Sequence, residues 1–557
     1  MLQLSLMEYI LDTTNYKTFR LIDNRTYVGT DAAPTAAMVV AARALPGDVV
    51  YFDADMNEFR LVERVKYNPL IGFFEVCSKT IYGMSSRGTP QFLFYPLNTA
   101  FPPMIVGYAG KRDANKLAIV RFDKWEDGEK FPRGSLENVL GNAGDYSTEL
   151  KSLVLAVCPW RDIAVTNGVG MAAKVPTAAS REFITSVNNW RTLNVDPDGC
   201  RDVDDVFSYR PLEMNRDILK DDIYEIAISI ADVSERIEEG SALDFAACER
   251  AETIYVGGGA AKPMLPAIFS EDICSLREGG APRPCVSLVF ELNVVTGVIS
   301  YMRFIKTMVE NNKTYTYDTI YDGEADARIL RTCAEVCSGS GSADSHEWIE
   351  ALMVFYNKEA AKLLLKSGSG LLRTHQAAGA DPAGIEPPIA DVPGLKYLLM
   401  NSAAYISTAS ALASGAPITH SMFGDAAYCH ATSPIRRYAD LVNQRQLKAA
   451  LFGELSSKSI QFIEYHLNKR AKEIRRFNRD SLFLDILYKC QEGTSLKGVC
   501  IETDSKGDNI KVYIPEWKKI VKIRGYDDAI PGDWLNVSYW FNPGQLRWKD
   551  KIVFRVD

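Results

Sequence analysis

The stretch that most constrains the fold is the decapeptide 196–205, Asp-Pro-Asp-Gly-Cys-Arg-Asp-Val-Asp-Asp. Five of its ten side chains are carboxylates, which repel one another when a fold gathers them. A divalent cation offsets that repulsion, and Mg²⁺ is the usual ion for a cluster of hard oxygen ligands. The decapeptide therefore indicates either a metal site or a solvated acidic turn, because Asp-Pro-Asp-Gly favours a turn in both cases.

An EF-hand calcium loop also begins with Asp-x-Asp, but the decapeptide does not continue as one. Counted from Asp196, the fifth position is Cys200 and the sixth is Arg201, where the loop needs an oxygen ligand and a glycine. The twelfth position is Phe207, where the loop needs a bidentate glutamate. The sequence therefore excludes an EF-hand.

The composition predicts a soluble protein of several domains. The chain has 557 residues, of which 47% are hydrophobic and 24% charged, and its apolar runs are too short to span a membrane. The apolar N-terminus has no basic start, so we expect no signal peptide. Eleven cysteines without regular spacing favour a reducing compartment, the cytoplasm or alternatively the nucleus. The close pair Cys333 and Cys337 has only His346 nearby, too few ligands for a zinc site.

Five landmarks follow one another in the order typical of one enzyme family. They are the aspartate pattern Asp196, Asp202, Asp204 and Asp205, then Ile-Ala-Asp-Val-Ser at 230–234, Pro-Met-Leu-Pro at 263–266, Cys-Ser-Leu at 274–276, and Thr-Ser-Pro-Ile-Arg-Arg-Tyr-Ala-Asp at 432–440. Together they resemble the ribonuclease II/ribonuclease R (RNB) superfamily, in particular its eukaryotic exosome-type branch. The resemblance implies processive hydrolysis of single-stranded RNA from a free 3′ end, releasing nucleoside 5′-monophosphates.

The resemblance assigns the acidic residues. Hydrolysis of a phosphodiester can use two divalent ions about 4 Å apart, which activate water and stabilise the leaving oxygen. We expect two Mg²⁺ ions, with Mn²⁺ as the alternative, held by Asp196, Asp202, Asp204 and Asp205. The family makes Asp204 the most sensitive of the four, as a ligand or as the residue that holds a ligand water.

The second catalytic element is Ser433-Pro434-Ile435-Arg436-Arg437. Serine followed by proline predicts a helix N-cap and first helical position, which would place both arginines in the first turn. A helix N-terminus with guanidinium groups is a phosphate site. By resemblance Arg436 faces the scissile phosphate and Arg437 is the second choice; the alternative for one of them is an ion pair with Asp440.

Three further residues match RNA-reading positions of the family. Tyr255 matches a residue that stacks on the terminal bases, and Tyr317 with Glu350 matches a pair implicated in choosing RNA over DNA. A carboxylate can accept a hydrogen bond from the 2′-hydroxyl, the group that distinguishes RNA. The alternatives are core packing for both tyrosines and a buried structural role for the glutamate.

The predicted fold class is multidomain α+β. We expect two N-terminal OB-fold cold-shock β-barrels at 1–62 and 63–160, a mixed α/β RNB catalytic domain at 161–487, and a C-terminal S1-like OB barrel at 488–557. A connector is predicted at 161–180, strands at 224–230 and 510–514, a loop at 338–344 and a helix at 345–366. We expect no N-terminal endonuclease domain of the kind some exosome relatives carry.

The net charge of −8 does not exclude an RNA binder, because such a protein needs only a local basic channel. One basic group spaced for a helix is Lys469, Arg470, Lys472, Arg475, Arg476 and Arg479, and a second is Lys518, Lys519, Lys522 and Arg524. A solvated helix face is the alternative meaning of the first group. OB barrels bind single strands through such charges and stacking aromatics.

Three positions depart from the family pattern without removing a charged catalytic group. Gln444 stands where the family often has histidine, Ala431 where phenylalanine is usual, and Val206 where alanine is usual. Two rival functions stay open on the same fold: a catalytically inactive RNA-binding regulator, and an exosome-type scaffold that works through protein partners of an RNA-decay complex.

Overall fold

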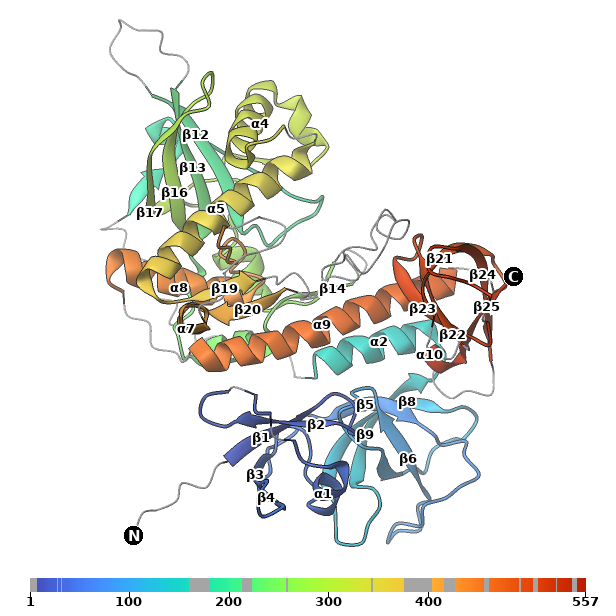
Figure 1. The fold of residues 1–557 in the computed structure, drawn as a ribbon. Helices are drawn as coiled ribbons and strands as arrows, with labels where there is room; N and C mark the ends of the chain where they lie inside the picture. Colours follow the sequence, from blue (N-terminus) through green and yellow to red (C-terminus); the bar gives the residue numbers. More distant parts are fainter. Residues whose placement is uncertain are drawn as a thin grey trace, which may run out of the picture. The chain divides into compact units, whose positions relative to one another are not determined.

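The computed structural model describes residues 8–159, 181–374, 403–414 and 426–557, apart from gaps at 28, 32, 213–222, 257–258, 342–343, 455–459, 490–491, 504–508, 527 and 543–547. The chain divides into two compact units (Figure 1). The first comprises Met1–Arg161, Ala377–Asn401 and Lys472–Asp557, and the second comprises Asp162–Gln376 and Ser402–Ala471.

The first unit begins with two β modules. Strands β1 (Glu8–Thr13), β2 (Phe19–Asp23), β3 (Val49–Asp53) and β4 (Glu58–Glu63) form an antiparallel sheet in the order β2-β1-β3-β4, accompanied by helix α1 (Ala36–Ala41). Strands β5 (Leu70–Phe74), β6 (Gln91–Pro96), β7 (Met104–Gly107), β8 (Lys116–Lys124) and β9 (Arg133–Asn142) close into a barrel, and helix α2 (Tyr146–Val157) packs against it. Among the described residues, the first module is a sheet rather than a closed barrel.

A third β module ends the chain. Strands β21 (Leu496–Thr503), β22 (Asn509–Ile514), β23 (Lys519–Arg524), β24 (Trp534–Phe541) and β25 (Ile552–Val556) follow helix α9 (Ile460–Lys489), with the short helix α10 (Trp548–Lys551) before β25. The sheet order is β23-β22-β21-β24-β25, and the two outer strands also contact each other. The predicted fold class, α+β with OB-type barrels, is confirmed; the boundaries between the individual domains stay predictions.

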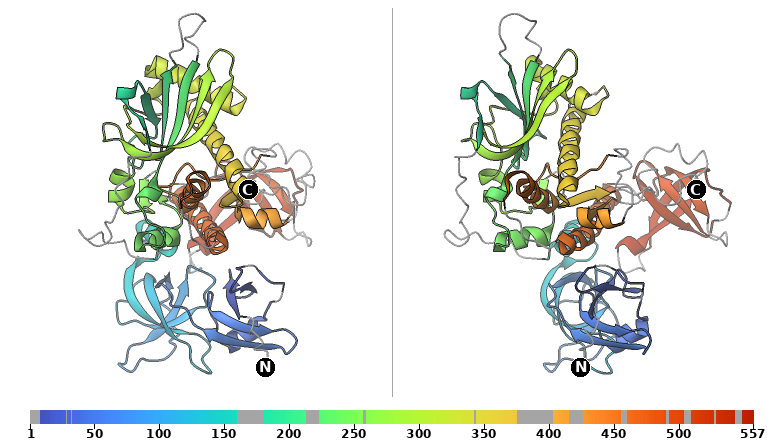
Figure 2. Two further views of the ribbon diagram at one scale, coloured as in Figure 1. Left: turned by 90° about the vertical axis from the view of Figure 1, so that its left-hand side faces the viewer. Right: turned by 60° about the vertical axis from the view of Figure 1, so that its left-hand side comes forward.

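The second unit is built on a seven-stranded sheet. Its order is β10-β17-β16-β13-β12-β11-β18, with β10 (Glu182–Ile184), β11 (Arg191–Val195), β12 (Asp205–Pro211), β13 (Ile223–Ala231), β16 (Arg283–Asn293), β17 (Ile299–Val309) and β18 (Lys313–Tyr315). Alternate side chains of β13 enter two different cores, so the sheet is covered on both faces. Helices α4 (Glu324–Ser338) and α5 (Ser345–Ser367) cover one face (Figures 1 and 2).

The other core lies beneath helices α3 (Ala242–Arg250) and α8 (Tyr438–Phe452). Two small antiparallel sheets of two strands each belong to the same unit: β14 (Ile254–Val256) with β15 (Gly259–Lys262), and β19 (Leu371–Thr374) with β20 (Ala404–Ser407), which leads into α7 (Thr408–Ser414). Short 3-10 helical segments lie at Ser186–Asn188, Val233–Glu235 and Thr319–Asp322, and a short π-helical segment lies at Ile268–Ile273.

The sequence patterns located several elements correctly. The helix predicted at 345–366 is α5, and the strands predicted at 224–230 and 510–514 are β13 and β22. The predicted loop at 338–344 follows the end of α4, with residues 342–343 outside the described residues. The connector predicted at 161–180 also lies outside them.

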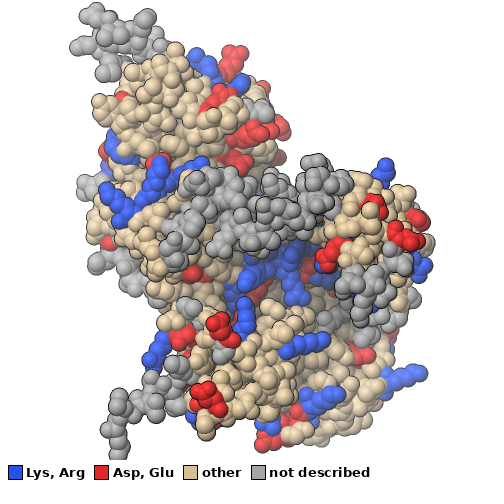
Figure 3. All heavy atoms as spheres, viewed as in Figure 1, with Lys and Arg blue, Asp and Glu red and all other residues tan. Residues whose placement is uncertain are grey.

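The first basic group lies along α9, where Lys and Arg side chains gather on the surface (Figure 3). Lys472, Arg476 and Arg479 are exposed, but Arg470 is buried. Arg476 donates to the carbonyl oxygen of Leu97 at 3.5 Å, so at least one member of the group also ties α9 to the second β module. Among the described residues, no helix is long and apolar enough to cross a membrane.

Lys519, in the second basic group, is expected to make the stability of the folded chain depend on pH. The Lys519 ammonium lies 3.7 Å from the centroid of the Phe483 ring, and burial, with the repulsion of Lys549, lowers its pKa to about 8. An unfolded lysine has a pKa of about 10.4, so between pH 8 and pH 10 the unfolded chain binds more protons than the folded chain. The contribution of Lys519 to stability therefore rises with pH across that window.

We expect Lys519→Met to be more stable than the wild type at pH 7, by on the order of a few °C in Tm, because the buried charge is removed. The advantage should shrink as the pH rises from 8 to 10, measured by thermal unfolding at each pH. Lys522→Met, at an exposed position of the same strand, is the control. A Tm difference that does not change with pH would contradict this origin.

Candidate active site

The decapeptide connects two neighbouring strands. Because β11 ends at Val195 and β12 begins at Asp205, and the strands pair antiparallel, Asp196 and Asp205 lie at the same end of the sheet. Both are half-buried, and their charges act on each other. Asp198, in the connection between the two strands, is exposed.

Asp204 is the most buried of the four predicted metal-binding aspartates, with 4% of its surface exposed. Its Oδ1 atom accepts the backbone N–H of Ile435 at 2.8 Å, and its Oδ2 atom lies 3.2 Å from Nε of Arg436. Burial raises the pKa of the Asp204 carboxyl, and the positive charge of Arg436 opposes that rise. The pairing brings together the two sequence segments, about 230 residues apart, that the family resemblance singled out.

The predicted helix N-terminus at Ser433 is wrong. Helix α8 begins at Tyr438, Pro434–Arg436 form a turn, and Arg437 is an extended N-cap residue with φ −134°. The reason is competition for backbone groups: the N–H of Ile435 donates to Asp204, and the N–H of Ser433 donates to Asp440. The arginines are therefore placed by these carboxylates and not by a first helical turn.

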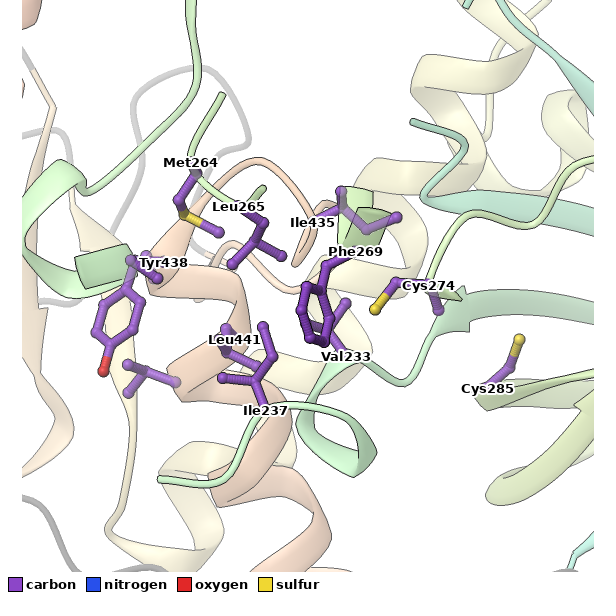
Figure 4. Close-up of a cluster of buried hydrophobic side chains, with 14 of the residues drawn as sticks. Val233, Ile237, Met264, Leu265, Phe269, Cys274, Cys285, Ile435, Tyr438 and Leu441 are labelled. Carbon is purple, nitrogen blue, oxygen red and sulfur yellow. The ribbon is translucent and has the colours of Figure 1, made fainter. Parts of the chain in front are cut away.

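The turn that carries Arg436 is anchored in the core. Ile435 is fully buried in the cluster that also contains Phe269, Cys274 and Leu441 (Figure 4). The side chain of Ser433 accepts from Nη2 of Arg436 at 2.9 Å. The guanidinium group thus has two of its donors held in place, a fixed orientation that suits bidentate contact with a phosphate.

Arg437 has different partners from Arg436. It forms an isolated β-bridge with Glu252, and its Nη2 donates to Asp440 at 2.8 Å. The ion pair with Asp440 that was the alternative for one arginine is therefore made by Arg437. Burial lowers the pKa of the Arg437 guanidinium, but the charge of Asp440 raises it, and the net effect is a raised pKa.

Tyr255 lies beside the aspartates. The N–H of Thr253 donates to the carbonyl oxygen of Arg436 at 2.9 Å, which aligns the segment leading into β14 with the arginine turn. The Tyr255 hydroxyl donates to Oδ2 of Asp202 at 3.2 Å, and 40% of the residue is exposed. The alternative of core packing is thus wrong for this tyrosine, whose ring is open to a ligand.

Tyr317 lies next to the same cluster on the other side. It follows β18, which pairs in parallel with β11, and the N–H of Asp196 donates to the carbonyl oxygen of Tyr315 at 3.1 Å. Burial and the charges of Asp196 and Asp205 raise the pKa of Tyr317 to about 12. Its ring packs against the α4/α5 core and stacks on His346 at a centroid distance of 3.6 Å, so part of its role is packing.

Glu350 lies one turn along α5 from His346 and is exposed, so it is not a buried structural acid. No hydrogen bond or ion pair joins it to another described residue, and the structure does not pair it with Tyr317. His346 was not predicted as a neighbour of Tyr317, although its spacing of four residues from Glu350 was a visible signal in the sequence.

Comparison with known protein families identifies the domain that carries these residues. The model of the RNB domain matches residues 184–328 and 323–453, and the model of the Dis3-like cold-shock domain 2 (CSD2) matches residues 91–157. The chain belongs to the RNB family. The arginine turn and the aspartate connection both lie inside the matched region, and the cold-shock match fits the exosome-type branch.

Individual RNB relatives are distant. A probable exosome complex exonuclease RRP44 from Caenorhabditis elegans is 23% identical over 524 residues, covering 77% of this chain and 53% of its own length. The chain therefore spans about half the length of that relative. The structure of Mycoplasma genitalium RNase R in complex with ribose-methylated single-stranded RNA has a TM-score of 0.71 at 16% identity, covering 99% of this chain and 100% of that one. Yeast Ssd1, a pseudonuclease, has a TM-score of 0.68 at 15% identity, covering 97% and 82%.

The chemistry of the RNB aspartates suits a hard divalent cation. Among the described residues, no three His, Cys, Asp or Glu side chains converge as a ready metal cage. Mg²⁺, however, is usually held by one or two carboxylates, with water and substrate phosphate completing its sphere. Burial and the charge of Asp196 raise the pKa of Asp205 to about 7, so a cation between these two carboxylates would relieve the repulsion.

Proposed function

We propose that the chain is a processive 3′→5′ exoribonuclease that hydrolyses single-stranded RNA to nucleoside 5′-monophosphates. The observation that carries this proposal is the pairing of buried Asp204 with Arg436 beside Asp196 and Asp205. It holds a phosphate-binding guanidinium against a carboxylate cluster suited to Mg²⁺ or Mn²⁺. The family match and the single-stranded RNA in the M. genitalium structure support the choice of substrate.

The proposed roles follow from the contacts. Asp204 orients the Arg436 guanidinium through Nε, so that a free N–H donor can contact the scissile phosphate and stabilise charge that develops there. Tyr255, exposed beside Asp202, stacks on a base near the 3′ end. Arg437 keeps Asp440 paired and supports the turn rather than contacting the phosphate.

We assign the divalent ions to Asp196 and Asp205 first, with Asp202 and Asp204 as the remaining predicted ligands. When bound, such ions supply an activated water and stabilise the leaving oxygen. The four aspartates fit this donor chemistry because all their side-chain oxygens are hard ligands.

The proposed partners are single-stranded RNA with a free 3′ end and proteins of an RNA-decay complex. The second proposal rests only on relatives named exosome complex exonucleases. The cytoplasm, or the nucleus, stays the expected compartment. A second candidate function, RNA binding without cleavage, is favoured by the similarity to yeast Ssd1, a pseudonuclease on the same fold.

The two candidate functions are separated by offering the chain a linear and a circular RNA of identical sequence with Mg²⁺. An exonuclease degrades the linear RNA and spares the circle, because the circle has no 3′ end. Degradation of both would indicate an endonuclease. Binding of the linear RNA with no degradation in Mg²⁺ or Mn²⁺ would favour the inactive regulator.

The ribose-reading proposal for Tyr317 and Glu350 makes a separate prediction. The 2′-hydroxyl can donate to the glutamate and accept from the tyrosine. Since Glu350 is exposed, we expect Glu350→Ala to lower the ratio of RNA to DNA cleavage rates only about fivefold, near 1 kcal/mol. Rates on matched oligonucleotides at one salt concentration measure this ratio.

Glu324→Ala, which removes an exposed acid from the start of neighbouring α4, should leave the RNA/DNA ratio unchanged. If Glu350→Ala and Tyr317→Phe also leave it unchanged, Tyr317 serves packing against His346 and ribose selection lies elsewhere.

A further inference from the structure

Asn194 occupies a polar position at the end of β11, beside the aspartate cluster. It has 2% of its surface exposed, and its side-chain Nδ2 donates to Oδ2 of Asp196 at 2.7 Å. Asp196 directly follows the last residue of β11, so the end of this strand brings the two side chains together. Asn194 itself is not one of the residues of the family pattern identified in the sequence.

The amide of Asn194 is itself held by two donors. Its Oδ1 atom accepts from Nδ2 of Asn311 at 2.7 Å and from the hydroxyl of Thr314 at 2.7 Å. Nδ2 of Asn311 also donates to the carbonyl oxygen of Leu276 at 2.8 Å, so the orientation of Asn311 is fixed in turn. Since both partners of Oδ1 are donors, a flipped Asn194 amide would lose these bonds and set oxygen against the Asp196 carboxylate.

We propose that Asn194 is a positioning residue that holds the Asp196 carboxylate for the divalent cation, with Asn311 and Thr314 fixing its amide. With the amide on Oδ2, the orientation of the Asp196 carboxylate is fixed, so that it would be ready to hold an ion. Removing a group that orients a metal-ligating side chain in this way commonly changes metal affinity 10- to 100-fold. The inference rests on the proposed function, because it assumes a cation at Asp196.

Asn194→Leu removes the donor and keeps the branched shape of the side chain. Thr192→Val is the matched control: Thr192 precedes Asn194 by two residues on the same side of β11, is fully buried, and loses only its 2.9 Å bond to the hydroxyl of Ser208. Asn194→Leu loses three side-chain hydrogen bonds and Thr192→Val loses one, but only Asn194→Leu loses the contact with Asp196.

The experiment titrates the full chain with Mn²⁺ alone, without RNA, and follows free Mn²⁺ by electron paramagnetic resonance, with thermal unfolding of each variant alongside. We expect Asn194→Leu to bind Mn²⁺ about tenfold more weakly and Thr192→Val to bind it as the wild type does. The cleavage defect of Asn194→Leu should shrink as Mg²⁺ is raised, and RNA binding in EDTA should not change.

If Asn194→Leu does not fold, the double variant Asn311→Ala/Thr314→Val tests the same idea, because it frees the Asn194 amide to turn and should also weaken Mn²⁺ binding. Wild-type Mn²⁺ affinity in either folded variant would overturn the positioning role. A wild-type chain that binds no Mn²⁺ and cleaves no RNA would instead overturn the proposed function, so the two failures are distinguishable.

Discussion

Replacing Asp204 by asparagine is expected to lower the rate of RNA cleavage about 10³-fold, roughly 4 kcal/mol, while RNA binding persists. Asparagine can still accept the N–H of Ile435, so the turn should remain in place. Its other amide group, an N–H donor, would face Nε of Arg436, and the charge that pairs with the guanidinium would be lost. Single-turnover rates and RNA affinity in EDTA measure the two effects.

Asp244→Asn is the matched control for Asp204→Asn. Asp244 is also fully buried and ion-paired, but its partners are the Tyr438 hydroxyl at 2.9 Å and Arg445 at 2.8 Å. This variant should lose stability and keep the cleavage rate of its folded fraction. Near wild-type cleavage by Asp204→Asn, or an equal loss of cleavage rate in Asp244→Asn, would contradict a catalytic role for Asp204.

Arg436→Lys is expected to lower turnover about 10²-fold, near 2.7 kcal/mol, with a smaller change in RNA affinity. Lysine keeps the charge but lacks the planar fork that contacts Asp204, Ser433 and a phosphate together. The comparison of kcat with the affinity for RNA measured in EDTA separates loss of transition-state stabilisation from loss of binding.

Arg437→Lys serves as the matched control, because Arg437 lies on the adjacent position and is engaged by Asp440 and Glu252. We expect this variant to reduce stability more than turnover. The assignment of the two arginines would have to be exchanged if Arg437→Lys gave the 10²-fold loss and Arg436→Lys did not.

The spacing of charged residues indicated the parts of the site but not how they are joined. Clustered carboxylates are costly without a cation, which made the decapeptide recognisable, and the order of the motifs pointed to the fold class confirmed by the RNB and cold-shock matches. The contact between Asp204 and the turn at Ile435 spans two distant segments, and no local periodicity encodes such a contact.

The helix start predicted at Ser433 was wrong for a related reason: contacts that the local sequence pattern does not encode. Serine followed by proline is a good N-terminal signal, but buried carboxylates of Asp204 and Asp440 bind the backbone N–H groups that a first turn would present. Asn194 and His346 were missed because a single amide or imidazole carries no sequence pattern, and each acquires its meaning from the side chain beside it.

The central claim is hydrolysis from the 3′ end, and product analysis tests it most directly. The substrate is a single-stranded RNA whose 3′-terminal nucleotide carries a radiolabelled 5′-phosphate. It is digested with Mg²⁺ by the wild-type chain and by Asp204→Asn, and the products are separated by size and by the position of their phosphate. We expect the wild type to release the labelled nucleoside 5′-monophosphate from the first time points and the variant to release none. Internal fragments, 3′-phosphorylated products, or equal digestion by both proteins would contradict it.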